Sequence, residues 1–249
     1  MRKELAEIIR GLSSRSLPEI GLALTALEAY LASLSPSLEQ FSKTNTLDLR
    51  LNALIALQDS FQYNVVSLLL EALAYLGQSA SPGETSQLLL LNHCMCGMLL
   101  IHSDSRRLFE RRTNMDLVLS LLDKLHPLCT PKVCISVLSL LVHVLVKSSA
   151  NLRVFEAAEG CKIVSQHLQV ISASAGETEP GTEDLSLKVV EFFIFYLTDE
   201  SGLEGQTRSI KYKADILRPH FAGIDELLRN LEEITTLKAP AAHHLMNGP

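Results

Sequence analysis

The sequence lacks several features that mark particular classes of protein. Its 22 lysines and arginines are scattered among 249 residues and the net charge is −6, so no basic stripe can follow a phosphate backbone. This argues against nucleic acid as a partner. The five cysteines are an odd number, lie within apolar segments and show no framework spacing, which favours a reduced, intracellular protein over a small secreted one.

Long apolar runs are also missing. The two most apolar stretches, residues 88–101 and 133–146, are shorter than the roughly 20 residues that a membrane span needs, and polar residues interrupt both. The opening segment "MRKELAEIIRG" places charges among apolar residues at helical spacing, unlike a signal peptide or an anchor. We therefore expect a cytoplasmic protein without membrane insertion, in which both stretches form buried helices.

Catalytic signatures are absent as well. The chain contains no GxxxxGK[ST], GxGxxG, GxSxG or HExxH motif, so we predict no catalytic residue, no cofactor and no metal. His93, Cys94 and Cys96 lie close together, but on a helix positions 94 and 96 point about 200° apart and cannot share one ion. The alternative hypothesis is a metal-dependent helical enzyme, and loss of a bound ion on changing His93 would favour it.

Other polar residues have a structural interpretation beside a chemical one. Cys129 and Cys134 flank an expected helix start, where Pro131 suits the first turn, and we favour packing over a redox pair. His143 lies on the apolar stretch 133–146 and is predicted to be a hydrogen-bonded interior histidine rather than a base. The carboxylates of "NLEEI" and "TDES" are predicted to be solvated.

Helical periodicity is what the sequence does contain. In residues 20–34, leucines recur at spacings of two, three and four, which predicts an amphipathic helix that a Ser-Pro-Ser stretch ends. Two further helical stretches follow, separated near residues 58–64, and Gly77 is a predicted C-cap. No segment shows the sustained apolar and polar alternation of a strand, so we predict an all-α protein.

Two stretches of the chain resemble each other. "SDSRRLFERRTNMDLVLSLLD" (103–123) aligns with "SSANLRVFEAAEGCKIVSQHL" (148–168) at an offset of 46 residues, and each follows a long apolar stretch. The aligned pairs include Arg107 with Arg153, Phe109 with Phe155 and Glu110 with Glu156. The predicted unit is a buried helix, a polar turn and an R-(L/V)-F-E start to a second helix. This period is typical of armadillo and HEAT arrays, which predicts a right-handed α-superhelix.

The array is predicted to continue toward the C-terminus. Residues 185–197 have the character of the next buried helix, and residues 223–237 form a last helix with a polar outer face. We therefore predict one domain over residues 1–238. Within it, the Ser-, Gly-, Glu- and Pro-containing segment at about 172–184 is predicted to be a mobile insertion, and residues 239–249 a disordered tail.

The paired arginines allow two interpretations. Arg107 and Arg153 could form a ladder of cations along a groove that grips an acidic or phosphorylated partner. In the second interpretation, which we favour, each arginine braces its own turn. Phe109 and Phe155 would then fill the gap between the two helices of each unit.

Three segments together resemble a known family. "LNALIALQDSFQYNVVSLLLEAL", "NLRVFEAAEGCKIVSQHL" and "KVVEFFIFYLTDE" are similar, in this order, to the fungal cell division control protein 14 family, a component of the septation initiation network. The likeness spans roughly residues 20–235. It does not extend to the phosphatase of the same name, since no cysteine here has an arginine six residues later.

The resemblance implies an armadillo-like, non-catalytic subunit. Family members bind a protein kinase of the germinal-centre type and support its activity and its placement at the spindle pole body during cytokinesis. We therefore expect a cytoplasmic kinase regulator or scaffold, with a general armadillo adaptor for another cytosolic protein as the alternative. The candidate contact residues, taken as the most exposed of the matched turns, are Asp59, Gln62, Asn64, Arg107, Asn151 and Arg153.

Overall fold

The fold is helical throughout the part of the chain that the computed structural model describes, residues 2–60, 63–79, 85–173 and 181–238. No strand occurs in these ranges, and the predicted all-α class is confirmed. The helices are α1 (Arg2–Leu12), α2 (Leu17–Ala32), α3 (Ser35–Thr44), α4 (Leu49–Gln58), α5 (Val65–Ser79), α6 (Thr85–Ile101), the 3₁₀ helix η3 (Ser103–Glu110), α7 (Arg112–Ser120), α8 (Pro131–Leu145), α9 (Ser149–Ala157), α10 (Gly160–Ala173), α11 (Thr182–Tyr196), α12 (Ile210–Leu217) and α13 (Ile224–Lys238).

Several of these helices begin where the sequence supplies a capping side chain. Asp48, Thr130, Ser148 and Ser209 precede α4, α8, α9 and α12, and each side chain accepts a hydrogen bond from a backbone N–H of the first turn. Such caps satisfy donors that have no partner within the helix. Pro131 occupies the first position of α8, as predicted, because its missing N–H is not needed there.

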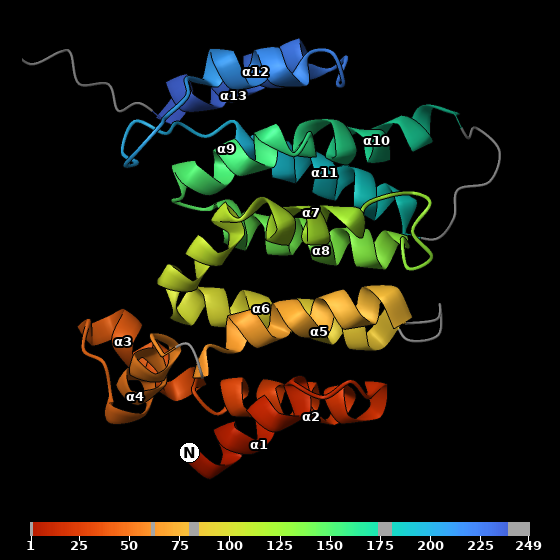
Figure 1. Cartoon of the computed structure of the whole chain (residues 1–249). Helices are drawn as coiled ribbons and strands as arrows, with labels where there is room; N and C mark the ends of the chain where they lie inside the picture. The colour runs from red at the N-terminus through yellow and green to blue at the C-terminus, as the bar shows by residue number, and fades with distance from the viewer. Residues whose placement is uncertain (1, 61–62, 80–84, 174–180, 239–249) are drawn as a thin grey trace, which may run out of the picture.

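The helices stack in layers along the chain (Figure 1). In one row, α2 packs on α6, α6 on α8, and α8 on α11. Each helix of this row has a partner in its own layer: α1 packs on α2, α5 on α6, α7 on α8, and α10 on α11. A single cluster of buried apolar side chains runs through the layers from Leu5 to Ile224. No layer could cover its own apolar face, so each depends on its neighbours for burial.

The two most apolar stretches form central helices of this stack. They correspond to α6 and α8, which pack against each other and bury leucines, valines and cysteines on several sides. The prediction of buried helices is confirmed for both. Their all-round hydrophobicity follows from having neighbours in the row on either side as well as in their own layer.

One further run is long and apolar enough to cross a membrane by length and composition alone. It covers Leu17–Thr44, and a third of its most apolar 18-residue window is buried inside the structure. The run consists of α2 and α3, which turn residues at 33–34 separate. Core helices of soluble proteins pass the same test, so the finding is weak evidence for a span.

The two stretches that resemble each other contain one element more than the sequence predicts. The R-(L/V)-F-E tetrad does not start the second helix but lies in a short helix of its own, η3 in the first copy and α9 in the second. The chain breaks afterwards because Arg111 is extended in the first copy and Glu159 adopts a positive φ of 57° in the second. Only then do α7 and α10 begin.

The prediction of Gly77 as a C-cap was wrong, and other helix boundaries differ in detail from the prediction. Gly77 lies inside α5 rather than capping it, since the buried face of that helix continues through Leu76. The Ser-Pro-Ser stretch ends one helix but also begins α3, with its proline in the first turn. The helix α12 was not predicted at all. Of the predicted insertion at 172–184, residues 172–173 end α10 and 182–184 begin α11, while residues 174–180 and the tail 239–249 lie outside the described residues.

Candidate functional site

Several residues from the segments that resemble the family lie in three polar junctions between layers. The junctions are on the side of the stack where the α4–α5 connection and the start of α9 are found (Figure 1). At the first junction, Asn64 caps α5 by accepting a hydrogen bond from the N–H of Ser67 (2.9 Å). Its amide nitrogen donates to the Gln58 carbonyl (2.9 Å) and to the Ser105 hydroxyl of η3 (3.3 Å). Asn64 therefore ties the α4–α5 connection to the next layer.

A histidine and an aspartate extend this first junction toward solvent. Nδ1 of His102 lies 2.8 Å from the Ser105 hydroxyl, and Nε2 lies 3.1 Å from a carboxylate oxygen of Asp59. The His102 side chain is buried, whereas the Asp59 side chain is 67% exposed. Asp59 thus presents its remaining oxygen to solvent at the edge of the stack.

The second junction joins η3 to α8 and α9. Asn151 is fully buried, and its amide nitrogen donates to the carbonyl oxygens of Arg106 and Val144, both at 2.9 Å. The Arg106 guanidinium donates to the carbonyl oxygens of His143 (2.9 Å) and Leu99 (3.2 Å). These side chains satisfy backbone carbonyls near helix ends that have no partner of their own.

The third junction is a buried ion cluster of Arg153, Glu156, Glu200 and Lys213. Nη2 of Arg153 lies 2.9 Å from Oε1 of both glutamates, and Nζ of Lys213 lies 3.1 Å from Oε1 of Glu200. The Glu200 side chain is only 2% exposed and Lys213 only 1%. The two positive and the two negative side chains compensate each other's charge, which offsets the free-energy cost of removing them from water.

Neutral groups complete the buried ion cluster. The Tyr196 hydroxyl donates to Oε1 of Glu156 (2.8 Å), and the backbone N–H of Arg208 donates to Oε2 of Glu200 (2.9 Å). Burial raises the pKa of Glu156, although the Tyr196 hydrogen bond and the Arg153 charge oppose that shift. The cluster fastens α9 to α11 and to α12.

The structure separates the predicted contact residues into two kinds. Asp59 and Arg107 are exposed, and Arg107 forms no ion pair within the described part of the chain. Asn151 is buried and the Arg153 side chain is only 13% exposed, so the premise that they are among the most exposed residues was wrong. Asn64 is half-buried and hydrogen-bonded, and Gln62 lies outside the described residues.

Glu200 and Lys213 were missed by the sequence interpretation. Glu200 belongs to "TDES", whose carboxylates were predicted to be solvated; that prediction was wrong for Glu200 because α12 places Lys213 against it. Its neighbour Asp199 is exposed. The signal that could have found Glu200 is its position directly after the aromatic helix α11, where a connection folds back over α9.

The paired phenylalanines are both fully buried. Phe155 does more than fill its own unit, since its ring lies 5.6 Å from that of Phe192 and 6.1 Å from that of Tyr196, both on α11. Gly160 makes this position possible: a Cβ there would lie 2.2 Å from the Phe155 ring. The turn between α9 and α10 is therefore shaped around one aromatic side chain.

Within the described residues, His93, Cys94, Cys96 and His143 do not cluster as possible metal ligands. His93 is exposed, while Cys94 is buried with its sulfur 3.7 Å from the Leu24 carbonyl oxygen, so the two side chains face different sides of α6. Nδ1 of His143 lies 2.8 Å from the Ser139 carbonyl oxygen, which confirms the hydrogen-bonded histidine.

A groove of about 920 Å³ lies at the N-terminal end of the stack, between α1 and α2. Its lining combines the charged side chains of Glu7, Arg10 and Arg50 with Leu22, which is 73% exposed. The buried Tyr30 hydroxyl also lines it and finds no hydrogen-bond partner within the described residues. The groove offers a concave surface with both apolar and charged parts.

A comparison with protein families finds a match over most of the chain. The model of the family described as "Cell division control protein 14, SIN component" matches residues 24–204, which include the first two junctions and Arg153, Glu156 and Glu200 of the third. Comparisons with curated proteins and with solved structures find no match.

Proposed function

Because the chain belongs to the cell division control protein 14 family of septation initiation network components, we propose that it is a non-catalytic regulatory subunit that binds a protein kinase of the germinal-centre type. In this proposal it supports the activity of the kinase and its placement during septum formation. It makes and breaks no covalent bond; it acts by holding a surface against the kinase.

The observation that carries the proposal is the family match over residues 24–204. The matched region holds all three of the segments that resemble the family. Some of their polar residues, among them Asn64, Asn151 and Arg153, lie in the junctions and bond from one layer to the next. Residues that maintain the helical stack would preserve the surface that a partner protein binds, which fits a non-catalytic binding role.

The proposed architecture is an armadillo/HEAT-like right-handed superhelix. Two features support it: the offset of 46 residues between matched turns, and the row of helices in which α2, α6, α8 and α11 pack successively. Arrays of this kind present extended surfaces to protein partners. The kinase would lie along such a surface rather than in a closed pocket.

The proposed contact surface is the exposed edge of the first junction, with Asp59 and Arg107 as its charged members. Both come from turns of neighbouring layers and reach solvent. Gln62 stays a predicted member. Asn64, Asn151 and Arg153 support this edge from within, in keeping with the bracing role that the sequence left open.

The proposed location follows from the proposed partner. A regulatory subunit of this kind works in the cytoplasm and is recruited to the spindle pole body together with its kinase. Recruitment would need no membrane insertion and no nucleic acid, since protein contact alone would supply it.

The experiment is an affinity purification of the protein from its native cells, followed by mass spectrometry. Three forms are compared: the parent, Arg107→Glu, and Arg229→Glu, which reverses an exposed arginine on α13 at the far end of the stack. Circular dichroism and a thermal melt of each purified form verify that the fold is retained. Both substitutions lie on the surface and should leave stability within about 0.5 kcal/mol.

Recovery of a germinal-centre-type kinase with the parent and with Arg229→Glu, but at least tenfold less with Arg107→Glu, supports both function and surface. Recovery with all three forms supports the function and rejects Arg107 as a contact. If the parent recovers no such kinase, the kinase proposal fails, and any other reproducible partner makes the general adaptor the better hypothesis.

A further inference from the structure

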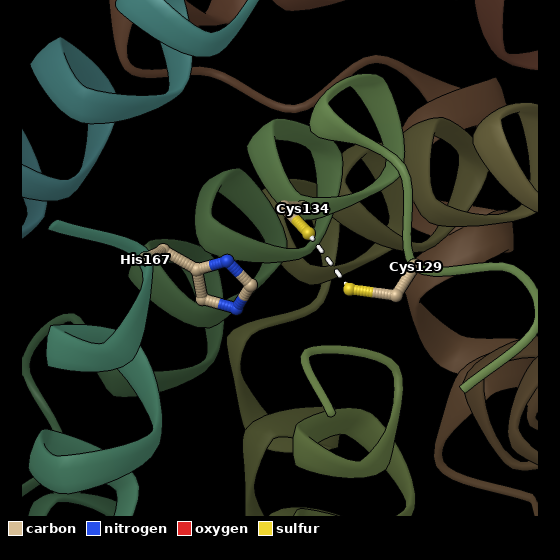
Figure 2. A group of neighbouring side chains, drawn as sticks. All are labelled: Cys129, Cys134 and His167. Atoms are coloured by element: carbon tan, nitrogen blue, oxygen red, sulfur yellow. Dashed lines mark hydrogen bonds between the residues drawn. The ribbon is translucent and has the colours of Figure 1, made fainter. Parts of the chain in front are cut away.

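Two cysteine side chains and one histidine side chain, all possible metal ligands, lie close together near the α7–α8 connection (Figure 2). Cys129 lies just before α8, Cys134 in its first turns, and His167 on α10. The two sulfur atoms are 3.5 Å apart, and both lie within 4.8 Å of an imidazole nitrogen of His167. Cys134 and His167 are buried and Cys129 is half-buried.

The histidine of this group has a fixed tautomer. Nε2 of His167 lies 2.8 Å from the carbonyl oxygen of Leu122, which can only accept a hydrogen bond, so Nε2 carries the proton. Nδ1 is then left with a free lone pair. Metal-bound histidines are held in this manner, with the second ring N–H donated to a backbone carbonyl.

We propose that Cys129, Cys134 and His167 bind a Zn²⁺ ion, with water as the fourth ligand. Tetrahedral zinc with bonds of about 2.3 Å to sulfur and about 2.0 Å to nitrogen separates its ligand atoms by about 3.5–3.8 Å. The sulfur pair already has this spacing. The imidazole has to approach by no more than about 1.3 Å from its present limit of 4.8 Å.

A disulfide explains the geometry less well than zinc. The sulfurs would have to approach from 3.5 Å to about 2.05 Å, and an oxidised pair would leave the fixed, neutral His167 without a role. Two thiolates and a neutral imidazole carry a charge of −2, which Zn²⁺ cancels in a partly buried setting. On binding, both thiols release their protons to solvent.

The ion would connect two layers of the stack. Cys129 belongs to the α7–α8 connection and His167 to α10, in the next layer. The hydrogen bond between His167 and Leu122 joins the same two parts. Zinc would therefore stabilise the array at a point remote from the first junction, independently of the proposed function.

The test is zinc binding by the purified full chain, reduced and freed of metal, with Zn²⁺ alone as the probe. Cys129→Ser removes one half-buried sulfur ligand, and Cys96→Ser, which changes another half-buried cysteine on α6, is the matched control. Metal content after gel filtration and competition with a chromophoric chelator give stoichiometry and affinity. Co²⁺ substitution reports sulfur ligation through its thiolate charge-transfer absorption.

We expect one zinc per chain for the parent and for Cys96→Ser, at least tenfold weaker binding for Cys129→Ser, and a thiolate band with Co²⁺ that Cys129→Ser diminishes. A hundredfold excess of Zn²⁺ over its dissociation constant should raise the melting temperature of the parent by about 5–10 °C. The proposal is overturned by a parent that binds no zinc, by equal binding in Cys129→Ser, or by a Cys129–Cys134 disulfide in protein isolated under thiol-blocking conditions.

Discussion

Arg107 and Arg153 occupy equivalent places in two copies of one motif, yet their surroundings differ completely. Arg107 lies in solvent on η3, whereas the Arg153 side chain on α9 is only 13% exposed and lies between Glu156 and Glu200. In the first copy the arginine that turns inward is Arg106, which donates to two backbone carbonyls. Its equivalent in the second copy is Leu152, an apolar core residue.

The difference comes from the next layer rather than from the motif. Behind α9, the connection from α11 to α12 brings Glu200 and Lys213 over the turn and encloses Arg153. Behind η3, the next layer contributes the amide of Asn151, which bonds to the backbone of Arg106 and leaves the neighbouring Arg107 side chain free to reach solvent. The neighbouring layer thus decides which side chains of a repeated motif are buried.

The largest expected effect concerns the ion cluster around Arg153. Glu200→Ala removes the carboxylate that faces both Arg153 and Lys213, leaving two buried cations with one anion. We expect the free energy of unfolding to fall by about 3–5 kcal/mol, measured by urea denaturation. Glu191→Ala, which removes an exposed partner of Lys188, should cost no more than about 1 kcal/mol. Equal losses would mean that the buried ion cluster does not fasten the layers.

A direct comparison of the two arginines should give the next largest effect. Arg153→Met is expected to cost about 2–4 kcal/mol in the same denaturation experiment. The loss is smaller than for Glu200 because Nε and Nη1 of Arg153 have no hydrogen-bond partner, so their removal relieves some unfavourable desolvation. Arg107→Met should change stability by less than about 0.5 kcal/mol. Matching values for the two variants would show that the turns are equivalent after all.

The smallest effect concerns the turn that follows each tetrad. Gly160→Ala forces a Cβ into the Phe155 ring and should cost about 1–3 kcal/mol. The equivalent residue of the first copy is Asn114, whose amide donates to the Leu108 carbonyl (2.7 Å), and Asn114→Ala should cost about 1 kcal/mol. A neutral Gly160→Ala variant would mean that Phe155 can shift without loss of packing on α11.

Much of the fold could be predicted because it depends on local pattern. The apolar spacing of residues 20–34, 133–146 and 185–197 marks helices wherever their neighbours lie, and Thr130 and Pro131 mark a helix start. Boundaries failed where a tertiary contact overrode the local signal. Gly77 continues α5 because Leu76 is still buried against the stack.

Prediction of the site was less complete, since exposure of a turn residue is not a local property. Asn151 and Arg153 look like ordinary polar turn residues, but they are enclosed by groups about 45 residues away along the chain. Glu200 looks like a solvated carboxylate until α12 is placed beside it. Asp59 and Arg107 stay predicted contacts because both side chains are exposed among the residues that the structure describes.

By itself the sequence determined an all-helical chain, the places of its long apolar helices and the two copies of one turn, because helical periodicity and capping act over a few residues. Only the tertiary structure decided which arginine is buried, which glutamate is paired, and that His167 meets Cys129 and Cys134. Those outcomes depend on side chains brought together from different layers, and the free energy of burying a charge is set by such neighbours.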